Sequence, residues 1–131
     1  MATKYNLVVF IGRLQPVHIG HIDVINTALR YADDVLVLIG SAGQPRTSKN
    51  PWTYQERATM VAESTTGGNI HTMPLSDSPY NDQQWALSVQ TQVEALCTSK
   101  KLGPDAKIAL IGHTKDESSY YLKMFPQWDL I

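Results

Sequence analysis

The sequence has one cysteine, no excess of charge of either sign and no long hydrophobic run. Cys97 has no second cysteine for an internal disulfide, so we expect it to be a small buried thiol in a reducing compartment. Eleven basic and twelve acidic residues give a formal net charge of -1, which argues against a nucleic-acid partner held through its backbone. No segment is long enough to cross a membrane, and MATKYN does not begin a signal peptide. We therefore expect a cytoplasmic protein with neither nucleic acid nor membrane as a partner.

Short apolar runs rich in β-branched residues alternate with helical patterns along the chain. The predicted strands cover residues 5–11, 34–39, 70–75 and 107–111, and the predicted helices cover 20–31, 53–64, 81–100 and 116–125. Strands joined by helices of this length require right-handed crossovers. This predicts a doubly wound, Rossmann-like α/β fold: a parallel sheet with helices on both faces. The final WDLI predicts one further strand, for about five in a single domain over residues 1–131.

Unusual polar residues follow each of the first four predicted strands. The loops read GRLQPVHIGH, GSAGQPRTSKNPWT, SDSPYNDQQW and GHTKDES. In a parallel sheet these loops open on one rim, beyond the carboxyl ends of the strands, where ligands bind in folds of this class. The convergence of four such loops predicts a ligand site there.

The first loop contains His18, Gly20 and His21, where a buried strand gives way to a helix. The free backbone N–H groups and positive dipole end of that helix form an anion site, and Gly20 removes a side chain where a phosphate would approach. Residues three apart lie on the same side of a helix start, so both imidazoles can donate an N–H to a phosphate. Donors placed in this way suit nucleotidyl transfer, with a metal ion and without a protein nucleophile. The alternatives are a metal pair, for which no third ligand has suitable spacing, or surface histidines.

Two longer motifs resemble a known family. GRLQPVHIGH resembles the H-x-G-H signature of nucleotidylyltransferases, and IGSAGQPRTSKNPWTYQER with the tryptophan of NDQQW resembles archaeal-type nicotinamide-mononucleotide (NMN) adenylyltransferases. The resemblance implies in-line transfer of AMP from ATP to NMN, giving NAD and pyrophosphate, with Mg²⁺ as cofactor. It also implies a homo-oligomer and, as in some bacteria, a fused Nudix hydrolase domain. The family's S-x-T-x-x-R segment is missing, so we expect this chain to lack its C-terminal segment and to be weakly active or inactive.

The resemblance implies roles for individual residues at the triphosphate. His18 and His21 are the predicted catalytic donors. The predicted phosphate-binding residues are Gly12, Arg13, Gly20, Lys49 and Lys115. Lys49 matches a position that is often arginine in the family, and a solvated loop is the alternative interpretation for it. No resident metal ligand is predicted.

The third loop carries the nicotinamide pocket that the resemblance implies. The indole of Trp85 would stack on the pyridinium ring, and the Asn81 amide would pair with the carboxamide. The alternative is that Asn81 caps the following helix while Trp85 packs in the core. Asp77 either shapes the pocket or makes a turn. Glu56 and Arg57 are expected to form an exposed pair without a chemical role, apart from a capping box between Thr53 and Glu56.

Other functions compete with this interpretation. HIGH also marks class I aminoacyl-tRNA synthetases, but no K-M-S-K-S-like segment exists. Another H-x-G-H nucleotidylyltransferase shares the catalytic logic, although the N-P-W-T-x-x-E-R stretch argues against it. The alternative from outside the enzymes is a non-catalytic module that binds nucleotides. Glycine-rich dinucleotide and Walker motifs are absent, which disfavours a dehydrogenase or a P-loop hydrolase.

Overall fold

The computed structural model of the chain describes residues 5–43, 46–48, 51–65, 69–77, 81–112 and 124–131. Its elements in chain order are β1 (Tyr5–Gly12), α1 (Ile19–Tyr31), β2 (Ala32–Ile39), α2 (Tyr54–Ser64), β3 (Asn69–Pro74), α3 (Asp82–Ser99), β4 (Ile108–Ile111) and β5 (Asp129–Leu130). They coincide closely with the elements predicted from the sequence. The predicted helix over 116–125 lies largely outside the described residues.

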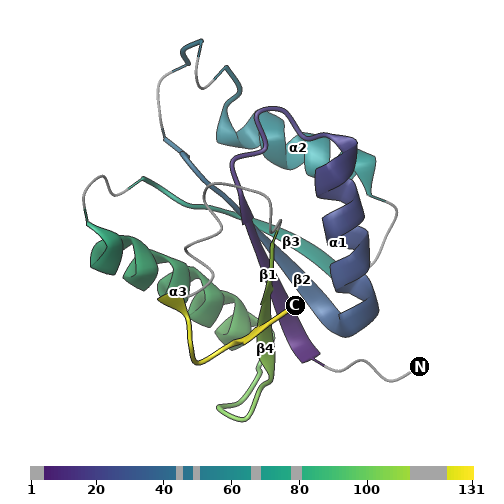
Figure 1. Cartoon of the computed structure of the whole chain (residues 1–131), viewed down its shortest axis with the longest axis vertical. Helices are drawn as coiled ribbons and strands as arrows, with labels where there is room; N and C mark the ends of the chain where they lie inside the picture. The colour runs from purple at the N-terminus through teal and green to yellow at the C-terminus, as the bar shows by residue number, and fades with distance from the viewer. Residues whose placement is uncertain (1–4, 44–45, 49–50, 66–68, 78–80, 113–123) are drawn as a thin grey trace.

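The described strands form one five-stranded sheet in the order β3-β2-β1-β4-β5, and all four pairings are parallel. Helices α1 and α2 cover one face of the sheet, and α3 covers the other (Figure 1). The doubly wound, Rossmann-like fold is therefore confirmed, including the fifth strand.

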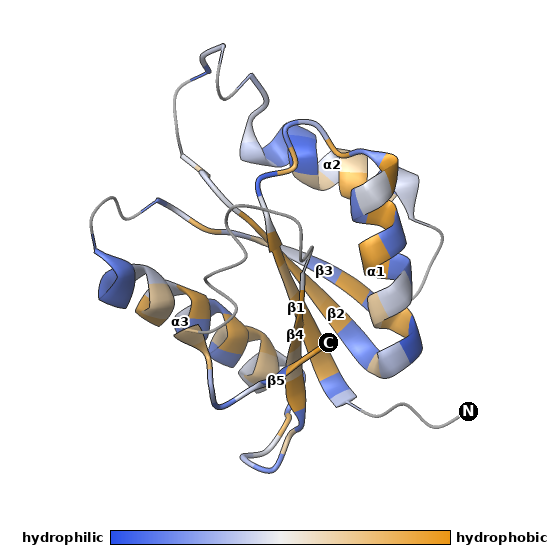
Figure 2. Cartoon of the chain, in the orientation of Figure 1, coloured by the Kyte–Doolittle hydropathy of each residue, from blue (hydrophilic) through white to orange (hydrophobic). Residues whose placement is uncertain are grey.

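Two apolar layers lie on either side of the sheet, because successive side chains of a strand point to opposite faces. In β2, Val35 and Val37 pack toward α1 and α2, whereas Leu36 and Leu38 pack toward α3. Figure 2 shows the strands as nearly continuous hydrophobic segments, as expected where both faces are covered. Cys97 is half-buried against the α3 layer, where burial, assisted by the negative charge of Glu94, raises the pKa of its thiol. No helix within the described ranges is long and apolar enough to cross a membrane.

The carboxyl ends of the three strands β1, β2 and β3 lie in register. Gly12 pairs with Ile39, which pairs in turn with Pro74. The pairing continues past the strands, where the Gly40 N–H donates to the Gly12 carbonyl at 2.8 Å and the Leu75 N–H donates to the Ile39 carbonyl at 2.9 Å. We call this edge, with the described residues 12–18, 40–53 and 75–81 that extend from it, the carboxyl rim. In Figure 1 the segments after β1 and β2 lie at the top, close to the starts of α1 and α2, and the segment after β3 lies at the left, close to the start of α3.

Candidate active site

Two histidines build the start of α1. His18 is the N-cap residue, and its Nδ1 atom accepts the Gly20 N–H at 3.1 Å. The His21 Nδ1 atom accepts the His18 N–H at 3.1 Å, which completes a reciprocal capping box. The two rings stack with their centroids 3.6 Å apart. Because Nδ1 of each ring accepts a main-chain N–H, an imidazole that is neutral at either position has its proton on Nε2.

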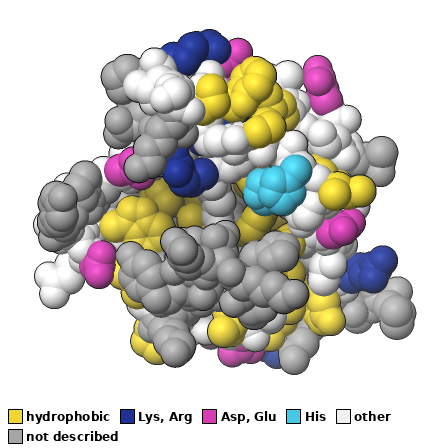
Figure 3. Space-filling model, turned by 45° about the horizontal axis from the view of Figure 1, so that its top comes forward, with side chains coloured by type: hydrophobic (Ala, Val, Ile, Leu, Met, Phe, Trp, Pro, Cys, Tyr) yellow, Lys and Arg dark blue, Asp and Glu magenta, His cyan; other side chains and the backbone are white. Residues whose placement is uncertain are grey.

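The histidine pair is accessible from the carboxyl rim. His18 is exposed, whereas His21 is half-buried, with its ring 6.2 Å from that of Phe10. Figure 3 shows histidine side chains at the edge of a hollow, with Lys or Arg side chains on its other side. The arrangement predicted from the spacing of His18, Gly20 and His21 is therefore present, and the helix begins one residue earlier than predicted.

The loop after β1 turns sharply at Leu14, which is buried and has a φ of 54°. A Cβ atom added at Gly12 would lie 3.3 Å from the Leu14 side chain and 3.4 Å from the Phe10 ring. Close packing therefore explains the glycine here, and its predicted contact with phosphate stays a prediction. Arg13 lies between these residues with an exposed side chain.

Arg57 is buried below this loop, so its predicted pairing with Glu56 on the surface is wrong. Only 1% of the residue is exposed. Its Nη1 atom donates to the carbonyls of Arg13 at 2.8 Å and Gly40 at 2.6 Å. Its Nη2 atom donates to the Ser41 carbonyl at 3.3 Å, and its Nε atom to the Thr53 carbonyl at 3.2 Å.

Burial lowers the pKa of Arg57, the charge of Arg13 lowers it further, and the carboxylate of Asp77 raises it. A sequence signal for the burial exists, because Arg57 lies four residues before Val61, the other buried residue of α2. Residues four apart share one face of a helix, so Arg57 lies on the face of α2 that packs on the sheet.

Glu56, in contrast, lies on the surface at the start of the same helix. It forms the predicted capping box with Thr53: the Thr53 N–H donates to Glu56 Oε1 at 2.9 Å, and the Glu56 N–H donates to Thr53 Oγ1 at 3.2 Å. Arg46 pairs with Glu56 at 2.8 Å on the surface and also donates to the Pro51 carbonyl. The backbone hydrogen bond from Thr53 lowers the pKa of Glu56, desolvation opposes this shift, and the charge of Arg46 lowers the pKa further.

The loops after β2 and β3 are joined by one side-chain contact. Ser41 Oγ lies 3.0 Å and 3.1 Å from the two carboxylate oxygens of Asp77, to which it donates. Ser41 has a φ of 53°, a left-handed conformation that is uncommon outside glycine. Asp77 is exposed on the rim and contributes to the shape of this loop pair.

Asn81 and Trp85 lie at the start of α3. Asn81 is the N-cap residue: its Oδ1 atom accepts the Gln84 N–H at 2.9 Å, and its Nδ2 atom donates to Gln84 Oε1 at 3.3 Å. Trp85 is half-buried against the α3 layer, 6.2 Å from the Phe125 ring. Asn81 therefore caps α3 and Trp85 packs against the core, which are the alternatives that the sequence left open. Their contacts with a nicotinamide nucleotide stay predictions.

Two predicted phosphate ligands, Lys49 and Lys115, lie outside the described residues. Within the described part of the chain, no three His, Cys, Asp or Glu side chains gather in a way that could hold a metal ion. The carboxyl rim therefore brings together the histidine pair, Arg13 with Arg57 beneath it, and the Ser41–Asp77 contact.

Comparisons with known proteins place this chain among nucleotidyltransferases. A family model described as cytidylyltransferase-like matches residues 9–124. The nicotinamide/nicotinic acid mononucleotide adenylyltransferase of Acinetobacter baylyi is 40% identical over 131 residues, which is 98% of this chain and 66% of that protein. The nicotinamide-nucleotide adenylyltransferase of Thermococcus onnurineus is 36% identical over 88 residues, which is 64% of this chain and 46% of that protein.

A solved structure is also similar along nearly the whole chain. It is a bifunctional NMN adenylyltransferase/ADP ribose pyrophosphatase from Francisella tularensis, complexed with AMP and a manganese ion. The match has a TM-score of 0.83 at 32% identity and covers 97% of this chain and 36% of that one. The present chain thus spans at most 66% of the length of each of these relatives.

Proposed function

Because this chain belongs to the cytidylyltransferase-like family, we propose that it transfers the AMP group of ATP to NMN, giving NAD and pyrophosphate. The observation that supports this most directly is the stacked pair of His18 and His21 at the start of α1. The adenylyltransferase activities named for the relatives from Acinetobacter, Thermococcus and Francisella support the choice of NMN as the acceptor.

The chemistry requires donors for a growing negative charge. An oxygen of the NMN phosphate attacks the α-phosphorus of ATP, the bond from that phosphorus to the bridging oxygen breaks, and pyrophosphate leaves with the electron pair. The Nε2–H groups of His18 and His21 donate to the phosphate oxygens, and the first N–H groups of α1 add their dipole. Arg13 contributes charge at the triphosphate, and Lys49 and Lys115 are further proposed ligands. No covalent enzyme intermediate is needed.

The nicotinamide end of NMN would occupy the other side of the rim, near α3. There the indole face of Trp85 is the proposed stacking surface for the pyridinium cation. Asn81 can offer Nδ2 to the carboxamide by exchanging its 3.3 Å contact with Gln84, while Oδ1 keeps capping the helix. Asp77, held by Ser41, would border this pocket.

A divalent cation, proposed to be Mg²⁺, accompanies ATP. Mg²⁺ in such reactions is commonly bound through substrate phosphates with few protein ligands, so the ion would be held mainly by the phosphate oxygens of ATP. When bound, the ion would neutralise charge on the phosphates.

We also propose a cytoplasmic homo-oligomer whose nucleotidylyltransferase domain is joined in the full protein to a Nudix domain. The second activity of the bifunctional Francisella relative, an ADP ribose pyrophosphatase, supports such a fusion.

The test is to incubate the complete gene product with ATP, NMN and Mg²⁺ and to measure NAD and pyrophosphate. We expect equal amounts of both products, and no reaction when the metal is chelated. Replacing NMN by its nicotinate analogue measures the preference between the two acceptors. Absence of NAD, with pyrophosphate released from ATP only when a different phosphate acceptor is supplied, would indicate a different H-x-G-H transferase. Tight NAD binding without turnover would indicate a non-catalytic module.

A further inference from the structure

The guanidinium group of Arg57 joins three segments that are distant in sequence. Its four hydrogen bonds reach the loop after β1 at Arg13, the loop after β2 at Gly40 and Ser41, and the N-cap residue of α2 at Thr53. The acceptors are all backbone carbonyls, so Arg57 fixes the main chain of these segments regardless of their side chains. A planar donor group of this kind suits several acceptors in fixed directions, which an ammonium group does not match.

The acceptors lie beside the two strained turns of the rim. Leu14, with φ of 54°, follows Arg13, and Ser41, with φ of 53°, follows Gly40. A non-glycine residue in this conformation costs about 1–3 kcal/mol and persists where its surroundings hold it. The bonds from Arg57 to Arg13, Gly40 and Ser41 supply such a constraint on both turns at once.

Within the described ranges, the Arg57 guanidinium forms no ion pair with a carboxylate. The nearby charges that act on it are those of Arg13, which opposes its ionisation, and Asp77, which favours it. The backbone carbonyls accept hydrogen bonds from its nitrogen atoms, but they carry no net charge and so do not cancel the positive charge of the guanidinium. This charge therefore adds to that of Arg13 at the carboxyl rim and favours an anionic ligand there.

We propose that Arg57 is a positioning residue for the triphosphate of the nucleotide substrate. It holds the loops after β1 and β2 in one arrangement, so that Arg13 and the start of α1 present their donors together, and it strengthens the positive potential behind them. The proposal rests on the proposed function for its reaction, but it also predicts binding of phosphate chains that can be measured without turnover.

The first test compares Arg57→Lys with Arg30→Lys in the complete gene product. Arg30 is exposed in the last turn of α1, so its variant is a matched control for the loss of a guanidinium group. At a temperature where both variants are folded, we expect Arg57→Lys to lower kcat by about 10- to 100-fold, since small misplacement of reacting groups has effects of that size. The KM for NMN should stay near the wild-type value. A kcat for Arg57→Lys equal to that of Arg30→Lys would overturn the proposal.

Chemical rescue provides a second measurement. Guanidinium ion added at millimolar concentration should restore part of the kcat of Arg57→Ala and leave Arg30→Ala unchanged, because only the first substitution opens a buried site that the ion fits. If Arg57→Ala does not fold, the comparison of kcat between Arg57→Lys and Arg30→Lys tests the proposal by itself. A purely stabilising role predicts a lower melting temperature with an unchanged kcat for the folded protein, which also contradicts the proposal.

Binding of inorganic tripolyphosphate, measured by calorimetry, separates the two proposals. We expect Arg57→Lys to bind it about tenfold more weakly than Arg30→Lys does, a difference worth about 1.4 kcal/mol. If the wild-type protein makes no NAD but this difference is found, the proposed function fails and the role of Arg57 at a phosphate site stands. If NAD forms at the same rate in both lysine variants, only the role of Arg57 fails.

Discussion

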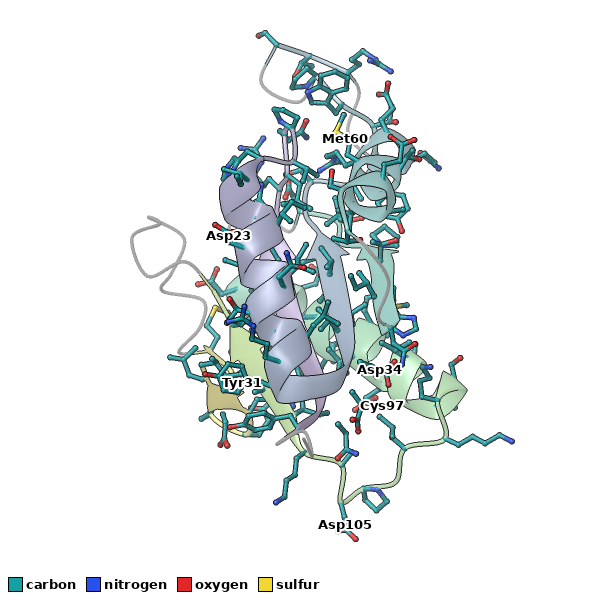
Figure 4. All side chains as sticks on the ribbon, turned by 90° about the vertical axis from the view of Figure 1, so that its right-hand side faces the viewer. Asp23, Tyr31, Asp34, Met60, Cys97 and Asp105 are labelled. Atoms are coloured by element: carbon teal, nitrogen blue, oxygen red, sulfur yellow. The ribbon has the colours of Figure 1, made fainter. Side chains whose placement is uncertain are left out.

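The two ends of the sheet differ in the partners of their buried charged side chain. At the amino end, the carboxylate of Asp34 lies 2.9 Å from Nε2 of His71 and 3.3 Å from Nζ of Lys100. Figure 4 shows Asp34 in the half of the molecule that lies away from Met60 of α2. At the carboxyl rim, the buried guanidinium of Arg57 meets backbone carbonyls instead.

The difference indicates which end is arranged for a ligand. Asp34 is paired with His71 of β3 and with Lys100, the C-cap residue of α3, so this contact ties α3 to the sheet. The guanidinium of Arg57 is hydrogen-bonded to carbonyls and stays ionised at neutral pH, and Arg13 is a second cation near it. Substitutions at the amino end should therefore change stability, and substitutions at the rim should change reaction rate.

The largest effect is expected from the histidine pair. We expect His21→Ala or His18→Asn to lower kcat by about 10²- to 10³-fold, the usual cost of removing one donor to a transition state. Asparagine at position 18 keeps an acceptor suited to the N-cap, so the start of α1 is retained while the Nε2 donor is lost. His71→Asn at the amino end is the control and should keep its kcat. Equal rates in all three variants would remove the assigned role of the pair.

An intermediate effect, on stability alone, is expected at Asp34. Asp34→Asn removes the charge that His71 and Lys100 share, and we expect a loss of about 1–3 kcal/mol in the free energy of unfolding, because both partners are still partly solvated. Asp105→Asn, on an exposed turn, is the control and should have no effect. Urea unfolding measures both variants. A lower kcat in folded Asp34→Asn would contradict the separation between the two ends.

The smallest effect on ligands is expected at Trp85, which lies in the first turn of α3 and packs in the α3 layer. Trp85→Ala should weaken NMN binding by about 0.5–2 kcal/mol, the range for a cation on an indole face, and leave ATP binding unchanged. Trp85→Phe keeps an aromatic face and should retain most of the affinity. Calorimetry with each nucleotide measures this. Equal weakening for ATP and NMN would point to a general loss of packing.

Local patterns explain why the fold and the histidine pair were predictable. Alternating layers in β1 and β2 follow from runs of apolar residues, and the spacing of His18 and His21 places both rings at one helix start. The capping role of His18 was not predicted, since Ser, Thr, Asp and Asn are the usual N-cap residues. Asn81, one of these, was recognised as a candidate cap.

Long-range contacts were the part that the sequence did not reveal. A charged residue such as Arg57 is normally solvated, and only its spacing from Val61 indicates that it turns inward. Its carbonyl acceptors lie up to 44 residues away and meet it only after β1 and β2 have paired. Asp34 and Lys100 likewise come together only when α3 returns across the sheet.

The histidine cap limits how the two imidazoles can move. Each ring has its Nδ1 atom committed to a main-chain N–H, so a half-turn of either ring would release the first turn of α1. Such rings are fixed hydrogen-bond donors and are poorly suited to carrying protons back and forth. Displacement of pyrophosphate by a phosphate oxygen needs no proton carrier, so this rigidity matches the demands of the proposed reaction.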